Sequence, residues 1–439
     1  MDIISSKTET LYGEINCPGD KSISQRAVIL SGLLNGDLKV KNFLFAADPL
    51  STLNAMRELG LQVRIENEII SIHAKDSLLK SPKMELNLGN SGTGIRLISG
   101  LIGGLGLHAT LTGDDSLSKR PMKRITKPLS EMGINIFAEN NCPPLQFKGA
   151  NLKKKFRYHM PVASAQLKSC LLLAAVAGEM ELELVEPVVS RNHTELMLQS
   201  FGANICSELT ENGHYIKYVP DRMIETDFIE IVGDFSSAAF FIIAGLITPE
   251  SDICIKGVGI NPSRAKLVEI LLDMGAKIEL VNSSTVNGEK IADLKVQYSE
   301  LQSINISPED VPVIIDEIPI LLIAAIFAKG KTTINGAEEL RVKESDRLAA
   351  MEAGLKALGV QVSSSHDSID VEGNPNFDLE SLTIIDSFGD HRIAMSFLVL
   401  GQRVAGDILV KDCNNIQTSY PDFMRDMIKL GGSLEEYAK

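Results

Sequence analysis

Several features are scarce or missing in this 439-residue chain, and each absence excludes a class of protein. Its six cysteines never form a C-x-x-C pair and none stands beside histidine at metal-ligand spacing, which argues against a disulfide scaffold or a zinc site. Positive charge is in deficit, with 43 Lys and Arg against 57 Asp and Glu, so we expect no nucleic-acid or anionic-membrane surface.

Long hydrophobic runs are also lacking. The longest, residues 311–328, contains two acidic residues and is too short to cross a bilayer. The first residues show no basic segment followed by an apolar core, as a signal peptide would. We therefore expect a reduced, cytoplasmic, metal-free protein without a membrane segment.

An internal repeat indicates the architecture. The chain is longer than one hydrophobic core usually serves, so two domains are expected. Six times, an amphipathic helix ends in an apolar residue, then glycine, then a short strand, with the glycines 69 to 84 residues apart. These are Gly60, Gly133, Gly202, Gly275, Gly359 and Gly431. Glycine fits a left-handed helix C-cap there, and the spacing predicts one β-α-β-α-β-β unit used six times.

Each repeat also contains an earlier helix that is apolar nearly all round. A helix without a polar face must be buried on every side, so helices form the core and sheets cover them. The sequence thus predicts an α/β protein of two similar inside-out domains, each of three β-α-β-α-β-β units. The six predicted buried helices span residues 23–34, 95–105, 167–177, 238–247, 318–328 and 393–399.

The boundary between the two sets of three repeats is marked by a repeated motif. Gly233-Asp234-Phe235-Ser236 opens the fourth repeat as Gly19-Asp20-Lys21-Ser22 opens the first. We place one domain at 21–232 and the other at 1–20 plus 233–439, with a hinge near 19–21 and 232–236. Two thin crossings between similar domains predict a cleft that closes on a ligand.

The stretch 18–26, Pro-Gly-Asp-Lys-Ser-Ile-Ser-Gln-Arg, concentrates polar chemistry at the start of a buried helix. Unpaired backbone N–H groups, two cations and a hydroxyl favour an anion there. The alternative is a serine N-cap beside two solvated cations. The entrances of the other buried helices decide between these interpretations, because equivalent entrances of repeated units lie at one end of each domain.

Three more polar stretches occur in the second and third repeats. Residues 88–97 carry three glycines among small polar residues, which allows close approach to an anion but is also typical of a flexible turn. Residues 119–124 form a basic run stiffened by proline, otherwise typical of a solvated face. Ser164-Ala165-Gln166 places a hydroxyl and an amide at a helix start, where a plain N-cap is the alternative, and residues 190–193 open the next helix.

Carboxylates and cations alternate in the fifth and sixth repeats. Asp316 and Glu317 precede a proline-started apolar helix, a placement that is commonly structural. Residues 341–347 alternate both signs, and on a helix they would form an exposed salt-bridge ladder. Gly389-Asp390-His391-Arg392 directly precedes another buried helix, so Arg392 repeats the placement of the cations in the first repeat.

In this order and at these spacings, the motifs closely resemble those of the 5-enolpyruvylshikimate-3-phosphate synthase family over essentially the whole chain. They are Pro-Gly-Asp-Lys-Ser-x-Ser-x-Arg, Gly-Asn-Ser-Gly-Thr-x-x-Arg, Arg-Pro-Met, Ser-Ala-Gln, Asp-Glu-x-Pro, Arg-Val-Lys-Glu-Ser-Asp-Arg and Gly-Asp-His-Arg. The resemblance implies the same inside-out fold and transfer of the enolpyruvyl group of phosphoenolpyruvate to the 5-hydroxyl of shikimate 3-phosphate, without metal or cofactor. We also expect a monomer.

The resemblance assigns roles by motif. Asp316 would be the base at the 5-hydroxyl, Glu344 the proton donor to the methylene carbon, and Lys21 an aid to proton transfer. The expected shikimate 3-phosphate residues are Lys21, Ser22, Arg26, Ser164, Ala165, Gln166, Ser190, Asp316 and Lys343. The expected phosphoenolpyruvate residues are Lys21, Gly92, Arg120, Gln166, Arg347 and Arg392.

Some positions depart from the best-known bacterial pattern. Ala165 stands where many members have serine, His193 where some have tyrosine, and Thr418 near the usual place of a C-terminal lysine, so no C-terminal lysine is assigned. Leu97 stands where proline is frequent after the glycine loop. Such a replacement resembles the second class of these enzymes, some of which are glyphosate-tolerant, whereas Gly92 leaves room for glyphosate. Two alternatives remain open. One is enolpyruvyl transfer to UDP-N-acetylglucosamine, although residues 117–121 lack that enzyme's usual cysteine; the other is a noncatalytic anion-binding repeat protein.

Overall fold

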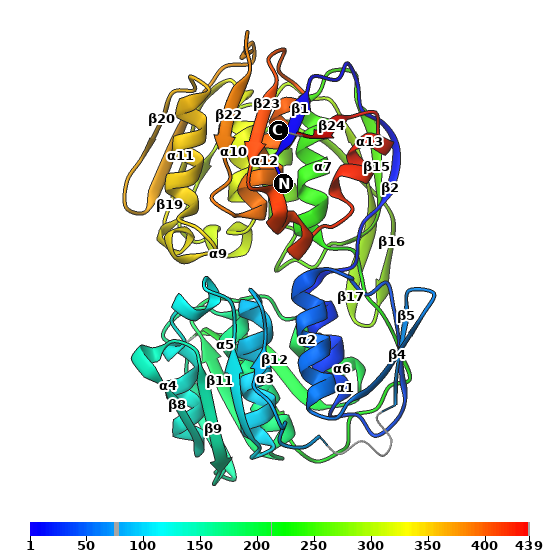
Figure 1. Ribbon diagram of the computed structural model, residues 1–439, viewed down its shortest axis with the longest axis vertical. Helices are drawn as coiled ribbons and strands as arrows, with labels where there is room; N and C mark the ends of the chain where they lie inside the picture. Colours follow the sequence, from blue (N-terminus) through cyan, green and yellow to red (C-terminus); the bar gives the residue numbers. More distant parts are fainter. Residues whose placement is uncertain (74–78, 212, 438–439) are drawn as a thin grey trace. The chain divides into compact units, whose positions relative to one another are not determined.

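The computed structural model describes residues 1–73, 79–211 and 213–437. The chain divides into two compact domains (Figure 1). The first domain comprises residues 19–232 and 285–289, and the second comprises 1–18, 233–284 and 290–439. The chain thus passes between the domains not only at 18/19 and 232/233 but also on either side of residues 285–289, which the repeat did not indicate.

Within the described residues, each domain contains three four-stranded sheets, and the six sheets share one strand order. In the first domain the orders are β14-β3-β5-β4, β6-β7-β9-β8 and β10-β11-β13-β12. In the second domain they are β16-β17-β15-β2, β18-β19-β21-β20 and β22-β23-β1-β24. Identical order in six sheets confirms that a single supersecondary unit is repeated.

The strands of the first domain are β3 (Leu38–Lys41), β4 (Gln62–Glu66), β5 (Ile69–His73), β6 (Leu86–Asn87), β7 (His108–Thr112), β8 (Ile134–Ala138), β9 (Leu145–Ala150), β10 (Lys155–His159), β11 (Glu181–Glu186), β12 (Asn204–Thr210), β13 (Gly213–Val219) and β14 (Phe228–Glu230). Its helices are α1 (Lys21–Ser31), α2 (Ala47–Glu58), α3 (Gly92–Gly104), α4 (Lys123–Met132), α5 (Ala165–Ala177) and α6 (His193–Ser200), with short 3₁₀ helices η1 (Leu117–Lys119) and η2 (Glu139–Asn141).

The strands of the second domain are β1 (Ile3–Ser6), β2 (Tyr12–Asn16), β15 (Asp252–Gly259), β16 (Lys277–Val286), β17 (Glu289–Gln297), β18 (Asn305–Ile306), β19 (Gly330–Asn335), β20 (Val362–Ser364), β21 (Ser368–Gly373), β22 (Thr383–Asp386), β23 (Ile408–Lys411) and β24 (Ser433–Glu436). Its helices are α7 (Phe235–Ile247), α8 (Lys266–Asp273), α9 (Val311–Ile314), α10 (Ile318–Ile326), α11 (Arg347–Ala357), α12 (His391–Gly401) and α13 (Phe423–Lys429), with 3₁₀ helices η3 (Glu338–Val342) and η4 (Cys413–Thr418).

The third repeat shows how the unit is built. Strands β10 and β11 are parallel and are joined by the buried helix α5, after which α6 leads into the antiparallel hairpin of β12 and β13. Three repeats borrow a strand from a distant part of the chain: β14 completes the first sheet, β2 the fourth and β1 the sixth. Both N-terminal strands therefore belong to the second domain.

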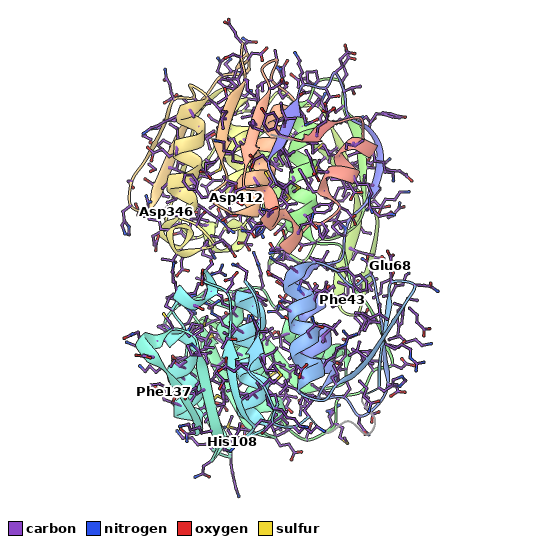
Figure 2. The ribbon with its side chains drawn as sticks, viewed as in Figure 1. Phe43, Glu68, His108, Phe137, Asp346 and Asp412 are labelled. Atoms are coloured by element: carbon purple, nitrogen blue, oxygen red, sulfur yellow. The ribbon has the colours of Figure 1, made fainter. Side chains whose placement is uncertain are left out.

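Helices fill the core of each domain, as the apolar patterns predicted. Every residue of α7, α10 and α12 is buried, and these three helices pack against one another. In the first domain α3 packs against α5 and α1. The outer faces of the sheets carry exposed side chains such as His108 and Phe137 (Figure 2). The inside-out α/β architecture is thereby confirmed.

The six glycines that end the second helix of each repeat all have positive φ, from 79° at Gly359 to 112° at Gly60. Side chains other than glycine adopt this left-handed conformation at a steric penalty, so glycine is favoured at the helix exit. The predicted C-caps are confirmed. The buried core helix precedes this second helix in every repeat, so the N-termini of the six core helices occupy equivalent places in the repeated unit.

Candidate functional site

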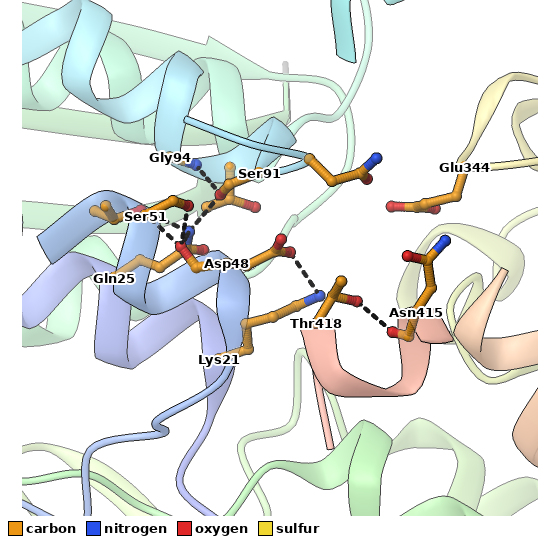
Figure 3. A network of polar contacts seen from close by, with 12 residues as sticks. Lys21, Gln25, Asp48, Ser51, Ser91, Gly94, Glu344, Asn415 and Thr418 are labelled. Carbon is orange, nitrogen blue, oxygen red and sulfur yellow. Dashed lines mark hydrogen bonds and ion pairs between the residues drawn. The ribbon is translucent and has the colours of Figure 1, made fainter. Parts of the chain in front are cut away.

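Helix α1 begins at Lys21 under an aspartate cap. Oδ1 of Asp20 accepts a hydrogen bond from the backbone N of Ile23 at 2.8 Å, so Asp20 and not Ser22 is the N-cap. Nζ of Lys21 lies 3.2 Å from Oδ2 of Asp48 (Figure 3). These two side chains are 17% and 12% exposed. The ammonium is held in place and still reaches solvent, as a group that meets an incoming anion must.

Arg26, one turn further along α1, is only 2% exposed, which excludes the solvated-cation alternative for this residue. Its Nε and Nη2 donate to Oγ1 of Thr194 and Oγ of Ser169, both at 2.8 Å. Burial lowers the pKa of Arg26 to about 10, opposed by three nearby carboxylates, while the charge of Arg191 lowers it further. The two guanidinium groups therefore repel one another, and a bound anion would relieve that repulsion.

Arg191 was not among the predicted site residues, although its motif, Ser190-Arg191-Asn192-His193, was singled out. Its place at the start of α6 was the available signal. His193, the first residue of α6, is buried, and its Nδ1 lies 2.6 Å from Oε1 of Glu289. This contact joins the 285–289 turn to the start of α6.

The glycine loop before α3 brings two arginines and an amide together. Nη1 of Arg96 donates to Oε1 of Gln166 at 3.0 Å, and Nε2 of Gln166 donates to Oγ1 of Thr93, also at 3.0 Å. A Cβ on Gly92 would lie 3.0 Å from Nη1 of both Arg96 and Arg120. Glycine at this position therefore leaves space between two guanidinium groups. Arg96 was within the recognised motif but was not assigned to the site.

The remaining first-domain residues lie around α5 and the approach to α6. Ser164 is the N-cap of α5, and its Oγ accepts from the backbone N of Leu167 at 3.4 Å, so the N-cap interpretation is correct for its hydroxyl. Ala165 is the first residue of the helix. Oγ of Ser190 donates to Oε2 of Glu186 at 2.7 Å. Nε2 of Gln25 on α1 donates to Oγ of Ser91, the N-cap of α3, and this bond connects α1 to the start of α3 (Figure 3).

In the second domain the guanidinium of Arg347 contacts three carboxylates. Its Nη1 lies 3.3 Å from Oδ1 of Asp316, its Nη2 lies 2.5 Å from Oε2 of Glu344, and its Nε lies 2.8 Å from Oδ2 of Asp390. Only 1% of the Arg347 side chain is exposed, whereas 16% of Asp316 and 26% of Glu344 are accessible. The predicted base and acid are thus fixed beside one cation and remain open to a substrate.

Asp316 is surrounded by further positive charge. Nη1 of Arg392 donates to the backbone O of Asp316 at 2.8 Å, and Nη2 lies 3.8 Å from its carboxylate. Arg264 approaches the same carboxylate to 4.0 Å. The carboxylate of Asp316 therefore faces the guanidinium groups of Arg264, Arg347 and Arg392.

Arg264 carries no signal in the sequence, because it stands outside every recognised motif. It is 5% exposed, and its Nη2 contacts Oδ1 of Asp234 at 3.1 Å and Oγ of Ser236 at 2.8 Å. Asp234 caps α7 as Asp20 caps α1. Ser236 in turn donates to Oε1 of Glu317. The repeated Gly-Asp-x-Ser motif thus positions a helix start in both domains.

Residues 341–347 do not form the helix assumed for the salt-bridge alternative. Residues 338–342 are 3₁₀ helix, 343–346 are irregular, and α11 starts only at Arg347, capped by Asp346. Arg347 is buried rather than part of an exposed ladder. Lys343 is half-buried, and burial together with Arg347 lowers its pKa against the opposing effects of Asp316 and Glu344.

At the C-terminal end, η4 packs beside the loop before α12. Nδ2 of Asn415 donates to the backbone O of Gly389, and Oγ1 of Thr418 donates to the backbone O of Asn415 at 2.6 Å (Figure 3). The turn at Thr418 therefore braces the Gly389-to-Arg392 segment with neutral hydrogen bonds. In the described part of the chain, no three His, Cys, Asp or Glu side chains are grouped to hold a metal.

Among the described helices, none combines the length and apolarity that a bilayer crossing requires. No disulfide bond joins any of the six cysteines, all of which lie in the described part of the chain.

Comparisons with known proteins show which family this chain resembles. The family described as EPSP synthase (3-phosphoshikimate 1-carboxyvinyltransferase) matches residues 5–427. Curated 3-phosphoshikimate 1-carboxyvinyltransferases from Thermoanaerobacter sp. (strain X514) and Magnetococcus marinus are 42% and 44% identical. These matches cover 97% and 99% of this chain and 99% and 97% of the relatives.

A solved EPSP synthase structure from Acinetobacter baumannii is also similar to the whole chain. It superposes with a TM-score of 0.87 at 38% sequence identity, and the match covers 99% of both chains. The chain belongs to the EPSP synthase (3-phosphoshikimate 1-carboxyvinyltransferase) family.

Proposed function

We propose that this chain transfers the enolpyruvyl group of phosphoenolpyruvate to shikimate 3-phosphate with the two residue sets described above. The reaction itself is that of its family: the 5-hydroxyl oxygen adds to C2 of phosphoenolpyruvate, and the tetrahedral intermediate then eliminates phosphate. The observation that carries the assignment of roles is the contact of Arg347 with both Asp316 and Glu344. One fixed cation orients a candidate base and a candidate acid.

In the addition step Asp316 takes the proton of the 5-hydroxyl as its oxygen bonds to C2, and Glu344 gives a proton to the methylene carbon C3. In the elimination step Glu344 removes a proton from the new methyl group, the C2–O bond to phosphate breaks, and Asp316 returns its proton to the leaving phosphate. The protons balance over both steps. Each carboxyl acts once as acid and once as base, and such groups contribute roughly 10²–10⁴ in rate.

Substrate binding falls to the cations and small polar groups. Lys343 with Asp316 in the second domain, and a helix-entrance set in the first domain, would hold shikimate 3-phosphate. The first-domain set is Lys21, Ser22, Arg26, Ser164, Ala165, Gln166 and Ser190. Phosphoenolpyruvate would be held by Lys21, Gly92, Arg120 and Gln166 and by Arg347 and Arg392. Arginine suits this role because its planar fork pairs with two oxygens of a phosphate or carboxylate at once.

The test is release of inorganic phosphate when the purified chain is given shikimate 3-phosphate and phosphoenolpyruvate together. A parallel reaction replaces shikimate 3-phosphate with UDP-N-acetylglucosamine, and a third omits the acceptor. Phosphate release in the first reaction alone is expected. Release with UDP-N-acetylglucosamine instead would transfer the assignment to the sister reaction, and release in none would leave only anion binding.

We also propose that the protein works in the cytoplasm as a monomer. The cysteines form no disulfide, and three of them lie outside the buried core. Thiols stay reduced in the cytoplasm, so this observation supports a cytoplasmic location. Light scattering coupled to size exclusion tests the monomer directly, since a particle of 47.7 kDa is expected. A mass near twice that value would contradict it.

A further inference from the structure

A buried charge cluster lies next to the proposed shikimate 3-phosphate residues without belonging to them. Lys168 of α5 is fully buried, and its Nζ lies 2.7 Å from Oε1 of Glu186 and 2.8 Å from Oε1 of Glu195. Both carboxylates are at most 2% exposed. Buried ion pairs of this kind lose hydration and are weak evidence for stability. A gain other than stability is therefore needed to explain why the cluster is there.

The cluster holds one residue of the approach to α6 at three points. The backbone N of Ser190 donates to Oε1 of Glu186 at 3.1 Å, and its hydroxyl donates to Oε2 at 2.7 Å. The backbone O of Ser190 accepts from Nζ of Lys168 at 3.1 Å. Nδ1 of His214, on β13, lies 2.8 Å from Oε1 of the same glutamate. Every polar group of Ser190 is thus fixed by charged partners, and the next residue is Arg191.

Neutral hydroxyl groups also connect α5 to α6. Ser169 follows Lys168 on α5, and Thr194 precedes Glu195 on α6. Oγ1 of Thr194 donates to Oγ of Ser169 at 2.7 Å, and the two hydroxyls receive the guanidinium of Arg26. The ion pair of Lys168 and Glu195 is therefore adjacent in both helices to the hydrogen bond between Thr194 and Ser169, whose hydroxyls accept from Arg26.

We infer that Lys168 is a positioning residue, whose ammonium holds Ser190 and so sets the spacing between Arg26 and the following residue, Arg191, so that the two guanidinium groups receive the phosphate group of shikimate 3-phosphate. This inference rests on the proposed function. Glu186 mediates it, because its carboxylate bonds to Lys168 and to Ser190 at once. Burial alone would raise the pKa of Glu186, but bonds from His214, Lys168 and Ser190 outweigh it, so the pKa is lowered and the carboxylate stays charged.

The test compares Lys168→Met with the wild-type chain in the phosphate-release assay. Loss of hydrogen bonds from a charged group should raise KM for shikimate 3-phosphate about 10- to 100-fold. KM for phosphoenolpyruvate should change less than about twofold, because Gly92 and Arg120 do not belong to α5 or α6, the two helices that Lys168 joins. A purely structural role would reduce the amount of folded enzyme and leave both KM values as they are.

Lys155→Met is the matched control, since it removes the same charge from a half-exposed lysine that pairs with glutamates of β11, the strand that also carries Glu186. Lys155 is 50% exposed and contacts Glu181 and Glu183. If Lys168→Met does not fold, the double variant Lys168→Met/Glu195→Gln removes one charge of each sign and leaves Glu186 its bonds to His214 and Ser190. The raised KM for shikimate 3-phosphate should persist in the double variant, because Ser190 still lacks its ammonium partner.

An unchanged KM for shikimate 3-phosphate in a folded single or double variant would overturn the positioning role while the proposed function stands. A wild-type chain that turns over neither substrate would overturn both.

Discussion

Nε of Arg347 lies 2.8 Å from Oδ2 of Asp390, and the two side chains are 1% and 0% exposed. Oδ1 of Asp390 also accepts from the backbone N of Arg392 at 2.9 Å, which caps α12. One aspartate therefore locks the cation that orients the proposed base and acid and also shapes the turn that presents Arg392. We therefore expect stability and catalysis to depend on the same side chain in the second domain.

Asp390→Asn is expected to lower the free energy of unfolding by about 3 kcal/mol at pH 7, because it removes the charge that faces a buried guanidinium. Burial opposes ionisation of Asp390, but Arg347 outweighs it and keeps its pKa below the ordinary 3.8. A lowered folded-state pKa adds stability above about pH 4, and this stability is lost as the pH falls further. Urea unfolding at pH 7 and at lower pH should show the difference between variant and wild type narrowing below pH 4.

Asp370→Asn serves as the comparison for this experiment. Asp370 pairs with Lys331 at 2.8 Å, but the two side chains are 29% and 48% exposed. Exposed pairs contribute about 0–1 kcal/mol. An effect as large as that of Asp390→Asn would show that burial is not what makes the Arg347 pair important.

Asp316→Asn and Glu344→Gln should each reduce kcat by roughly 10²–10⁴ with less than about tenfold change in either KM. Both variants keep the shape of the side chain and remove its ability to exchange a proton. Steady-state phosphate release measures the effect, and the exposed Glu300, replaced by glutamine, is the control for an acidic side chain in the same domain. Wild-type kcat in both variants would contradict the assigned acid and base.

Gly92→Ala should raise KM for phosphoenolpyruvate about tenfold or less while the protein folds normally. The new methyl group would lie 3.0 Å from Nη1 of both Arg96 and Arg120, closer than ordinary contact, so at least one guanidinium must move. Gly36→Ala is the matched control, because nothing lies within 4 Å of its added methyl group. Equal KM values in the two variants would show that the arginines adjust without loss of binding.

Binding of shikimate 3-phosphate should weaken on the alkaline side through Lys343. Burial and Arg347 lower the pKa of this lysine from its ordinary 10.5, so its positive charge is lost at lower pH than that of a solvated lysine. Lys343→Arg keeps the charge at higher pH and should shift the rise of KM for shikimate 3-phosphate upward in pH. A KM profile from pH 6 to 10 that is the same for both proteins would argue against a binding role for the Lys343 charge.

Local patterns were enough to predict the repeated unit. Glycine after an amphipathic helix has one favoured conformation, and Gly60 to Gly431 all adopt it. The apolar helices were equally readable, because a helix without a polar face has nowhere to lie except the core. Capping was predicted less well: the hydroxyl of Ser22 was a plausible cap, yet the carboxylate of Asp20 takes that role.

Sequence alone thus determined the sixfold repeat, the buried helices and the residues gathered at their entrances, because backbone preference and hydrophobic periodicity act over a few neighbouring positions. Only the tertiary structure decided that β1, β2 and β14 complete distant sheets and that Arg264 reaches Asp316. It also decided that Lys168 shares its charge between Glu186 and Glu195. Such pairings join segments far apart in the chain, and they depend on packing that no local pattern records.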